Sequence, residues 1–333
     1  MKYSVIIPVY NRPQELAELL ESLARQTLKD PSVLIEVIVV DDGSRQRAEP
    51  VAAQYAERLD IHYFYKTNSG PGSARNYGFE RASGDFFLMF DSDCLIPPDY
   101  FNIVHKHVKY NEVQSFGGPD ASLPSFTLTQ KAINYAMTSY FTTGGIRGKK
   151  KRIGPYQARS FNMGFSRKVY EATGGFRNLR VSEDIDLSIR IRKAGFETVL
   201  IPEAFVYHKR RTSLRQFFFQ TYAFGKGRVN IAKIYPSEAR LVHTFPTLFV
   251  IFCLSMIFTP LLSFSFFQIQ LSAVLFYLTL VLSDAITSNQ SLSVGLMAVP
   301  TVLVQMTGYG LGFLDGLISP KNLGTARAKP VKE

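Results

Sequence analysis

Cysteine is scarce in this sequence, and tryptophan is absent. Of the 333 residues only Cys94 and Cys253 are cysteines, and they lie in different parts of the chain. Two such residues do not make a disulfide framework, which fits a protein of a reducing compartment. Met1 to Ser4 lead directly into an apolar run and leave no room for a signal peptide. We therefore expect the N-terminal part of the chain to face the cytoplasm.

Charged residues are also unevenly distributed. From about Phe245 they nearly vanish until the last dozen residues, although the whole chain has a formal net charge of +11. This contrast predicts a soluble domain followed by a membrane region. A basic excess suits nucleic acid, an anionic membrane surface or phosphate-rich ligands. Because a membrane region is predicted, we favour the last two and expect no nucleic acid as a partner.

Four apolar runs in the first part of the chain have the composition of buried β-strands. They are Val5–Ile7 (ending at Pro8), Ile35–Val40, Ile61–Tyr65 and Phe86–Phe90. Helical periodicity over Glu15–Gln26 and Ser73–Ala82 places helices between them. Asn11 is predicted to be the N-cap of the first helix, with Pro13 in its first turn. This alternation predicts an α/β fold with right-handed crossovers and a mostly parallel, doubly wound sheet.

Polar residues follow three of these predicted strands at the point where each ends. The clusters are Tyr10-Asn11-Arg12, Asp41-Asp42 and Asp91-Ser92-Asp93. A doubly wound sheet brings such strand ends together in one crevice, where ligands bind. Because side chains two apart on an extended segment point the same way, Asp91 and Asp93 are candidates to hold Mg²⁺ or Mn²⁺. The structural alternative is a polar turn after a core strand.

Asp41 and Asp42, and residues of the stretch Asn68–Asn76 that follows the third apolar run, suit a nucleotide. Asp41 or Asp42 offers acceptors to a ribose or a base, and Gly70 with Gly72 allows close approach of the backbone. Arg75, near a predicted helix start, suits a diphosphate. The alternative for each residue is an ordinary turn residue or a solvated charge.

The middle of the chain gives weaker signals. A helix is predicted over Phe126–Phe141, and Arg147–Arg152 form a basic loop that is either solvated or in contact with anionic headgroups or a lipid-linked diphosphate. Ser182 is predicted to cap a helix that ends at Gly195. The acidic residues Glu183 and Asp184 in its first turn have a sufficient structural explanation in the helix dipole. Asp186 is interpreted as a solvated or structural charge.

The motifs, taken together, resemble a known family. Val5–Pro13, Asp41–Ser44, Asn68–Gly78 and Asp91–Asp93 are similar, in this order, to the nucleotide-sugar half of family 2 glycosyltransferases, which have the GT-A fold. The resemblance covers roughly residues 1–235 and implies an inverting transferase that uses a nucleotide-diphospho-sugar and a divalent metal, Mg or Mn. The implied nucleotide-sugar-binding residues are Pro8, Tyr10, Asn11, Arg12, Asp41, Asp42, Gly70, Arg75, Asp91 and Ser92, and the implied metal ligands are Asp91, Asp93 and His208.

The same resemblance implies the catalytic group. A turn such as Gly174-Gly175-Phe176, followed by an acidic pair at a helix start, forms the acceptor site in the family. Asp184 matches the general base, and Glu183 its acidic neighbour. An inverting single displacement needs a carboxylate that takes the proton of the acceptor hydroxyl. The sequence lacks the Gln-x-x-Arg-Trp motif of processive synthases, which argues against cellulose- or hyaluronan-type polymerisation.

Four segments follow from this reading: a catalytic domain at 1–208, amphipathic interface helices at 209–243, transmembrane helices at 244–320 and a basic tail at 321–333. The predicted spans are Phe245–Phe267, Leu271–Ile286 and Leu292–Ile318, the first two forming a hairpin. Three crossings from a cytoplasmic start would leave the basic tail outside, against the positive-inside tendency. The sequence leaves two and three crossings open.

The sequence as a whole predicts an enzyme at the cytoplasmic face of the inner membrane. Its expected donor is a nucleotide-diphospho-sugar, with UDP favoured, and its expected acceptor a lipid-linked sugar, an oligosaccharide or a polysaccharide. Membrane lipids are expected partners. Two alternatives stay open: a polyprenyl-phosphate sugar synthase, and a non-catalytic membrane scaffold that binds nucleotide sugars.

Overall fold

The computed structural model describes residues 1–144, 156–179 and 181–320. These residues form two compact units, and each is described by itself below. The first unit contains 1–123 and 156–209, and the second contains 124–144 and 210–320. The basic loop at Arg147–Arg152 and the basic tail lie outside the described residues.

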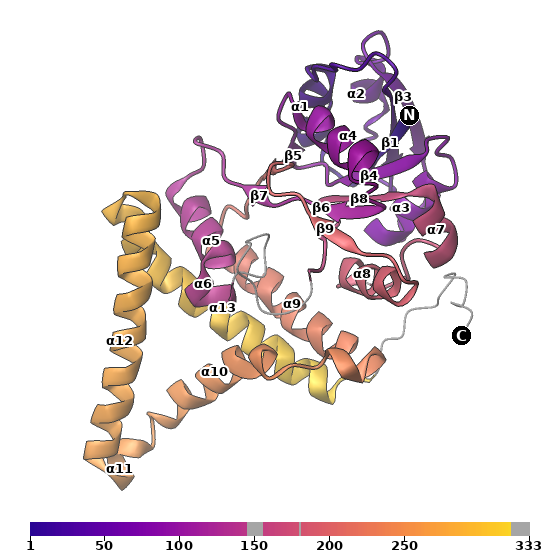
Figure 1. The fold of residues 1–333 in the computed structure, drawn as a ribbon. Coiled ribbons are helices and arrows are strands. Elements are labelled where there is room, and N and C mark those ends of the chain that lie inside the picture. The colour runs from indigo at the N-terminus through magenta and orange to yellow at the C-terminus, as the bar shows by residue number, and fades with distance from the viewer. Residues whose placement is uncertain (145–155, 180, 321–333) are drawn as a thin grey trace. The chain divides into compact units, whose positions relative to one another are not determined.

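The first unit is built on a sheet of seven strands in the order β3-β2-β1-β4-β8-β6-β9 (Figure 1). The strands are β1 (Lys2–Val9), β2 (Leu34–Asp41), β3 (Asp60–Tyr65), β4 (Phe86–Phe90), β6 (Ser115–Gly117), β8 (Asn162–Ser166) and β9 (Thr198–Leu200). Only β8 runs against the others, because it pairs antiparallel with both β4 and β6. The predicted α/β fold with a mostly parallel sheet is confirmed. Pro8 does not end its strand, since β1 continues to Val9, which pairs with Asp41.

Helices cover both faces of this sheet. The helices α1 (Pro13–Ala24), α2 (Glu49–Ala53) and α4 (Tyr100–Tyr110) pack on one face. The opposite face is covered by α3 (Pro71–Phe79), α7 (Arg167–Thr173) and α8 (Glu183–Lys193). Alternate residues of β1 divide between the two cores, with Val5 and Ile7 facing the first and Ile6 the second. A sheet buried on both faces explains why its strands read as continuous apolar runs.

A small second sheet lies at the end of this unit, in the order β5-β10-β7. Its strands are β5 (Cys94–Leu95), β7 (Asp120–Ala121) and β10 (Val206–His208). In the antiparallel pair of β5 and β10, His208 lies opposite Cys94. This pairing brings the last strand of the unit beside the residues that follow β4.

Two predicted helix caps differ from the structure. The prediction that Asn11 caps α1 is wrong, because Asn11 has a φ of +54° and α1 begins after Arg12 without a side-chain cap. The Oδ1 atom of Asn11 instead accepts a hydrogen bond from the backbone N–H of Arg45 at 2.8 Å. Ser182 does stand at the N-cap position of α8, but it has a φ of +68° and its side chain makes no capping bond.

The second unit is helical. It consists of α5 (Leu128–Thr138), α6 (Tyr140–Thr143), α9 (Leu214–Ile234), η1 (Pro236–Glu238), η2 (Leu241–Thr244), α10 (Phe245–Ser255), α11 (Thr259–Leu262), α12 (Phe264–Asn289) and α13 (Leu292–Ile318). The helix predicted over Phe126–Phe141 is two helices, because Ser139 has an extended backbone conformation. They belong to this unit, whereas the sequence assigned residues 124–144 to the catalytic domain. One helix, α9, fills most of the segment predicted as interface helices.

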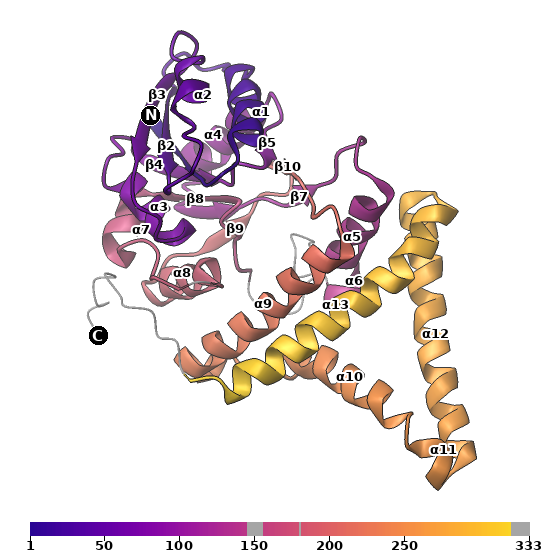
Figure 2. The ribbon, with the colours of Figure 1, turned by 180° about the vertical axis from the view of Figure 1, so that it is seen from behind.

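Among the described residues, the helices α12 and α13 are long and apolar enough to cross a membrane. The predicted span Phe245–Phe267 is wrong, because the chain breaks there into α10, α11 and the start of α12. The connection predicted between the first two spans, Ser263–Gln270, is not a loop, because α12 begins at Phe264 and contains Gln270. Figure 2 shows α10, α12 and α13 as three sides of a triangle, with α11 at the corner that joins α10 to α12.

Candidate active site

The guanidinium of Arg75 joins two parts of the first unit that are far apart in sequence. Its Nη2 atom lies 2.5 Å from Oδ1 of Asp91, just beyond β4, and its Nη1 atom lies 3.4 Å from Oε1 of Glu183, at the start of α8. The Arg75 side chain is only 2% exposed and also lies over the ring of Phe176. The Asp91 loop and the acidic start of α8, both predicted from sequence, therefore lie within the reach of one side chain.

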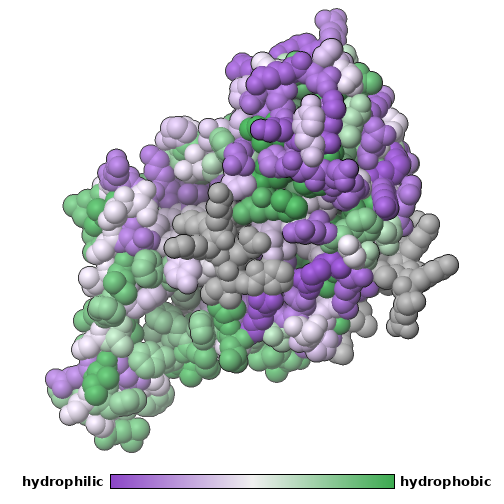
Figure 3. All heavy atoms as spheres, viewed as in Figure 1, coloured by the Kyte–Doolittle hydropathy of each residue, from purple (hydrophilic) through white to green (hydrophobic). Residues whose placement is uncertain are grey.

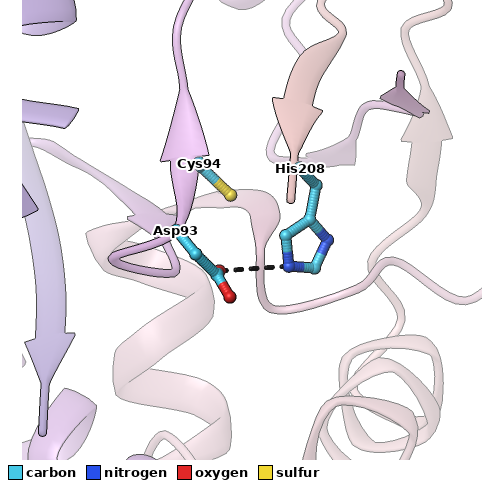
Figure 4. Close-up of side chains that lie close together, drawn as sticks. All are labelled: Asp93, Cys94 and His208. Carbon is cyan, nitrogen blue, oxygen red and sulfur yellow. Dashed lines mark ion pairs between the residues drawn. The ribbon is translucent and has the colours of Figure 1, made fainter. Parts of the chain in front are cut away.

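Asp93 is held between two other predicted site residues. Its Oδ2 atom pairs with Nη1 of Arg12 at 2.5 Å, and its Oδ1 atom lies 3.2 Å from Nε2 of His208. Figure 4 shows the imidazole of His208 directed toward Asp93, with Cys94 beside them. The pairing of β5 with β10 sets this position, and the ring of Phe161 packs against that of His208 with centroids 4.7 Å apart.

These donors suit a divalent metal ion. Asp93, Cys94 and His208 each offer one ligand atom, and these three atoms lie within 4.8 Å of one another. The 3.2 Å between Asp93 and His208 is close to the ~3.0 Å that separates neighbouring donors around an octahedral ion with bonds of ~2.1 Å. Burial raises the pKa of the Cys94 thiol well above its usual value, and sulfur is a soft donor that suits Mg²⁺ or Mn²⁺ poorly. Asp91, a predicted ligand, is not in this group and pairs with Arg75 instead.

Asp41 and Asp42 organise the loops around them. The Asp41 carboxylate is fully buried and accepts hydrogen bonds from the backbone N–H groups of Ser44 and Ala48 and from the hydroxyl of Tyr63. Asp42 pairs with Nζ of Lys66 at 2.7 Å and accepts from the backbone N–H groups of Ser69 and Gly70. Asp42 therefore shapes the loop that precedes α3, in which Gly70 has a φ of +94°.

The remaining residues of the predicted nucleotide site differ in their exposure. Pro8 and Ser92 are buried, and Tyr10 is 48% exposed at the end of β1. Asn11 is exposed and is tied through its side chain to Arg45. The exposed ring of Tyr10 is thus available to a ligand. The side chains of Pro8 and Ser92 are buried, so these two residues support the backbone of the site.

The acidic pair at the start of α8 lies in a charged environment. Burial and the neighbouring carboxylate of Asp184 raise the pKa of Glu183 to about 7, and the guanidinium of Arg75 partly opposes the rise. Oδ1 of Asp184 accepts the backbone N–H of Ile185 at 2.8 Å, and its Oδ2 lies 3.7 Å from Nη1 of Arg159. Glu183 is therefore suited to hold a proton near neutral pH. Sequence reasoning missed Arg159, which follows a stretch without a clear motif.

The turn at Gly174-Gly175-Phe176 is fixed by side chains from two helices. Asn76 of α3 accepts from the backbone N–H of Phe176 and donates to its carbonyl, both at 2.8 Å. Arg190 of α8 donates to the carbonyls of Thr173 and Gly175 at 2.7 and 2.6 Å. Arg190 is itself paired with Asp186, which is structural and fully buried. Neither Asn76 nor Arg190 was singled out from the sequence, because helical spacing alone does not show what a polar side chain meets.

Comparison with known proteins gives a consistent family. The family model described as Glycosyl transferase family 2 matches residues 4–174. An uncharacterized glycosyltransferase of Rickettsia typhi is 41% identical over 107 residues, which cover 31% of this chain and 32% of that protein. The poly(ribitol-phosphate) beta-N-acetylglucosaminyltransferase TarS of Staphylococcus aureus strain Mu50 is 41% identical over 154 residues, which cover 41% of this chain and 26% of TarS. The chain thus spans about a third or less of these two relatives.

A solved structure matches most of the chain. The mannosyltransferase PcManGT of Pyrobaculum calidifontis, solved in complex with GDP-Man and Mn²⁺, superposes with a TM-score of 0.60 and 16% identity. The match covers 95% of this chain and 87% of that one. At this level of identity the similarity shows a shared fold, in agreement with the predicted GT-A architecture.

Proposed function

This chain belongs to glycosyltransferase family 2, and from that membership we propose that it transfers a sugar, with inversion, from a nucleotide-diphospho-sugar to an acceptor hydroxyl. The observation that carries the proposal is the position of Arg75 between Asp91 and Glu183. It joins the loop proposed to hold the donor diphosphate to the helix start proposed to activate the acceptor. An inverting displacement needs both groups at one centre.

Donor binding is assigned to the residues beyond β1, β2 and β4. The proposed nucleotide-sugar site consists of Tyr10, Asn11, Arg12, Asp41, Asp42, Gly70, Arg75, Asp91 and Ser92, together with the buried Pro8. Asp42 acts by shaping the loop at Gly70, and the exposed ring of Tyr10 offers a face for a base. A UDP-sugar is the favoured donor. The two similar proteins differ in the sugar that their names give: N-acetylglucosamine for TarS, and mannose for PcManGT, which was solved with GDP-Man.

A divalent metal, Mg or Mn, is proposed as the cofactor. Asp93 and His208 would hold it, with Asp91 as a further proposed ligand. The imidazole favours Mn²⁺ over Mg²⁺, and Mn²⁺ is the ion in the PcManGT structure. When bound, such an ion stabilises the negative charge that develops on the departing nucleotide diphosphate.

Asp184 is proposed as the general base. Its Oδ1 atom is oriented by the backbone N–H of Ile185, so the carboxylate is held in place at the N-terminus of α8. Asp184 would take the proton of the acceptor hydroxyl. Because the pKa of Glu183 is raised, Glu183 holds a proton, and the neighbouring carboxyls of Glu183 and Asp184 are then not both negatively charged. The buried Asp186–Arg190 pair fixes the turn beside them.

The acceptor is proposed to be a lipid-linked sugar, an oligosaccharide or a polysaccharide at the cytoplasmic face of the inner membrane. Two helices apolar enough to span a membrane support a membrane location, and the poly(ribitol-phosphate) named for TarS shows that a polymer acceptor occurs among relatives. Membrane lipids are the proposed surroundings of the second unit.

A donor screen tests the proposal directly. Membrane extracts containing the protein should release nucleotide from one of several nucleotide-diphospho-sugars, with Mn²⁺ raising the rate. Asp184→Asn should reduce transfer to a sugar hydroxyl at least ~10²-fold, since a general base contributes that much or more. Full activity of Asp184→Asn would favour a polyprenyl-phosphate acceptor, which needs no strong base. Nucleotide binding without turnover of any donor would favour the non-catalytic scaffold.

A further inference from the structure

We propose that α10, α11 and α12 enter the bilayer as a re-entrant hairpin whose corner stays in the hydrocarbon. Both ends of the hairpin, and both ends of α13, then remain on the side of the first unit. This topology rests on the proposed membrane location but goes beyond it, because α12 and α13 could equally cross the bilayer as two spans by length and composition.

The corner and the helix α12 have the chemistry of a surface that faces hydrocarbon. Residues 244–283 contain no Asp, Glu, Lys or Arg. Leu261 and Leu262 at the corner are each 84% exposed, and Phe264, Ile269 and Phe276, at different positions around α12, are 63–66% exposed. Figure 3 shows many hydrophobic residues over this part of the molecule, with hydrophilic ones among them. A helix that is mostly apolar, and exposed over most of its length, is stabilised by lipid around it.

The corner keeps much of its backbone hydrogen bonding internal. Across the break between α10 and α12, the N–H groups of Met256, Ile257, Phe258 and Leu261 donate to carbonyls three residues earlier, and the N–H of Ser263 donates to the carbonyl four residues earlier. Pro260, in the same turn, has no N–H to satisfy. Gln270 of α12 donates to the hydroxyl of Ser255 of α10 at 2.9 Å and joins the two arms. A backbone that changes direction inside hydrocarbon requires this internal pairing.

The C-terminal end of α12 is tied to helices that cannot lie across the membrane. Oδ2 of Asp284 accepts hydrogen bonds from the hydroxyls of Tyr135 and Ser139 at 2.7 and 2.8 Å. The chain leaves the first unit after residue 123 and returns to it by residue 156. This excursion is shorter than the ~40 residues that two crossings need. Tyr135, Ser139 and the end of α12 at Asp284 therefore lie on the side of the first unit.

The helix α13 is bound along its second half to the basic helix α9. Gly308, Gly312 and Gly316 pack in turn against Thr221, Tyr222 and Val229, so the two helices run in the same direction. Nζ of Lys226 pairs with Asp315 at 2.7 Å, and Nζ of Lys233 donates to the carbonyl of Gly316 at 2.6 Å.

Because α9 carries Arg215, Lys226, Arg228 and Lys233, it does not qualify as a span, and α13 stays beside it at the interface. The basic residues that follow Ile318 in the sequence then satisfy the positive-inside tendency.

Cysteine accessibility in the full-length protein tests this topology. The background is Cys253→Ser, and Cys94 can stay because it is buried. In this background Tyr110→Cys marks the side of the first unit, because Tyr110 is 71% exposed. Ser288→Cys, Ile318→Cys and Leu261→Cys report the end of α12, the end of α13 and the corner. Each variant is treated with a membrane-impermeant maleimide in spheroplasts and in inverted membrane vesicles, and again in SDS.

We expect Ser288→Cys and Ile318→Cys to react in the same preparation as Tyr110→Cys, and Leu261→Cys to react only in SDS. Reaction of Ser288→Cys from the opposite side would overturn the proposal in favour of two crossings. Reaction of Leu261→Cys in spheroplasts or in inverted vesicles would show that the corner reaches water, which would also overturn the proposal. Recovery of the protein in the soluble fraction would overturn membrane entry altogether. Labelling does not depend on sugar transfer, so failure of the catalytic proposal is detected separately by the donor screen.

Discussion

Arg190 donates through Nε to Oδ2 of Asp186 at 2.8 Å, in a pair whose two side chains are 3% and 0% exposed. The remaining donors of Arg190 hold the carbonyls of Thr173 and Gly175. One buried ion pair thus connects the interior of α8 with the turn next to its acidic start. An arginine that is buried to this extent depends on its carboxylate partner.

Asp186→Ala should therefore be strongly destabilising. Loss of the carboxylate leaves Arg190 charged and buried, which costs about 3–5 kcal/mol of unfolding free energy. Asp186→Asn keeps an acceptor and should lose less. Thermal unfolding in detergent measures the effect, and Glu171→Gln, at an exposed position of α7, is the control, expected within ~0.5 kcal/mol of the parent. Equal stability of Asp186→Ala and the control would show that the pair contributes little.

His208→Ala should weaken metal binding without disturbing the sheet. The variant removes one of the two donors that lie 3.2 Å apart, so we expect the dissociation constant for Mn²⁺ to rise at least ~10-fold. Electron paramagnetic resonance of free Mn²⁺ measures this constant without a turnover assay. Cys94→Ala is the matched control, because a soft sulfur donor adds little to a site for Mg²⁺ or Mn²⁺. A smaller effect for His208→Ala than for Cys94→Ala would remove the imidazole from the ligand set.

Glu183 should make stability depend on pH in an unusual direction for a carboxylate. Its pKa is raised from 4.5 to about 7, so between these values the folded protein holds a proton that the unfolded chain has released. The free energy of unfolding should fall as pH rises through this window. Glu183→Gln should flatten the dependence when melting temperatures are compared at pH 5 and pH 7.5. An unchanged slope in Glu183→Gln would assign the titration to another group.

Gly312→Ala should disturb the contact between α9 and α13. A Cβ atom at Gly312 would collide with the backbone carbonyl of Tyr222, which cannot move aside as a side chain can. Overpacking of this kind costs about 1–3 kcal/mol, so we expect a lower melting temperature and faster proteolysis. Leu311→Ala, at a neighbouring position that is 38% exposed, is the control and should have a smaller effect. A tolerated Gly312→Ala would mean that the two helices are not tightly packed.

The sequence by itself determined the first four strands of the first unit, the helices after the first and third of them, the polar residues at the strand ends and the family. These features are local, because apolar periodicity and turn residues report on neighbours in the chain. It also indicated that His208, more than a hundred residues beyond Asp93, belongs to the same site, although only through the resemblance to a family.

The tertiary structure alone decided which charged side chains form ion pairs with one another. Asp91 and Asp93 are two residues apart, yet one pairs with Arg75 and the other with Arg12 and His208. It also decided that Asp186 is buried, that 124–144 belong to the helical unit, and that the first predicted span is broken into α10, α11 and the start of α12. Each of these outcomes depends on contacts between segments distant in sequence, where burial and pairing set the free energy of a polar group, and no local pattern carries that information.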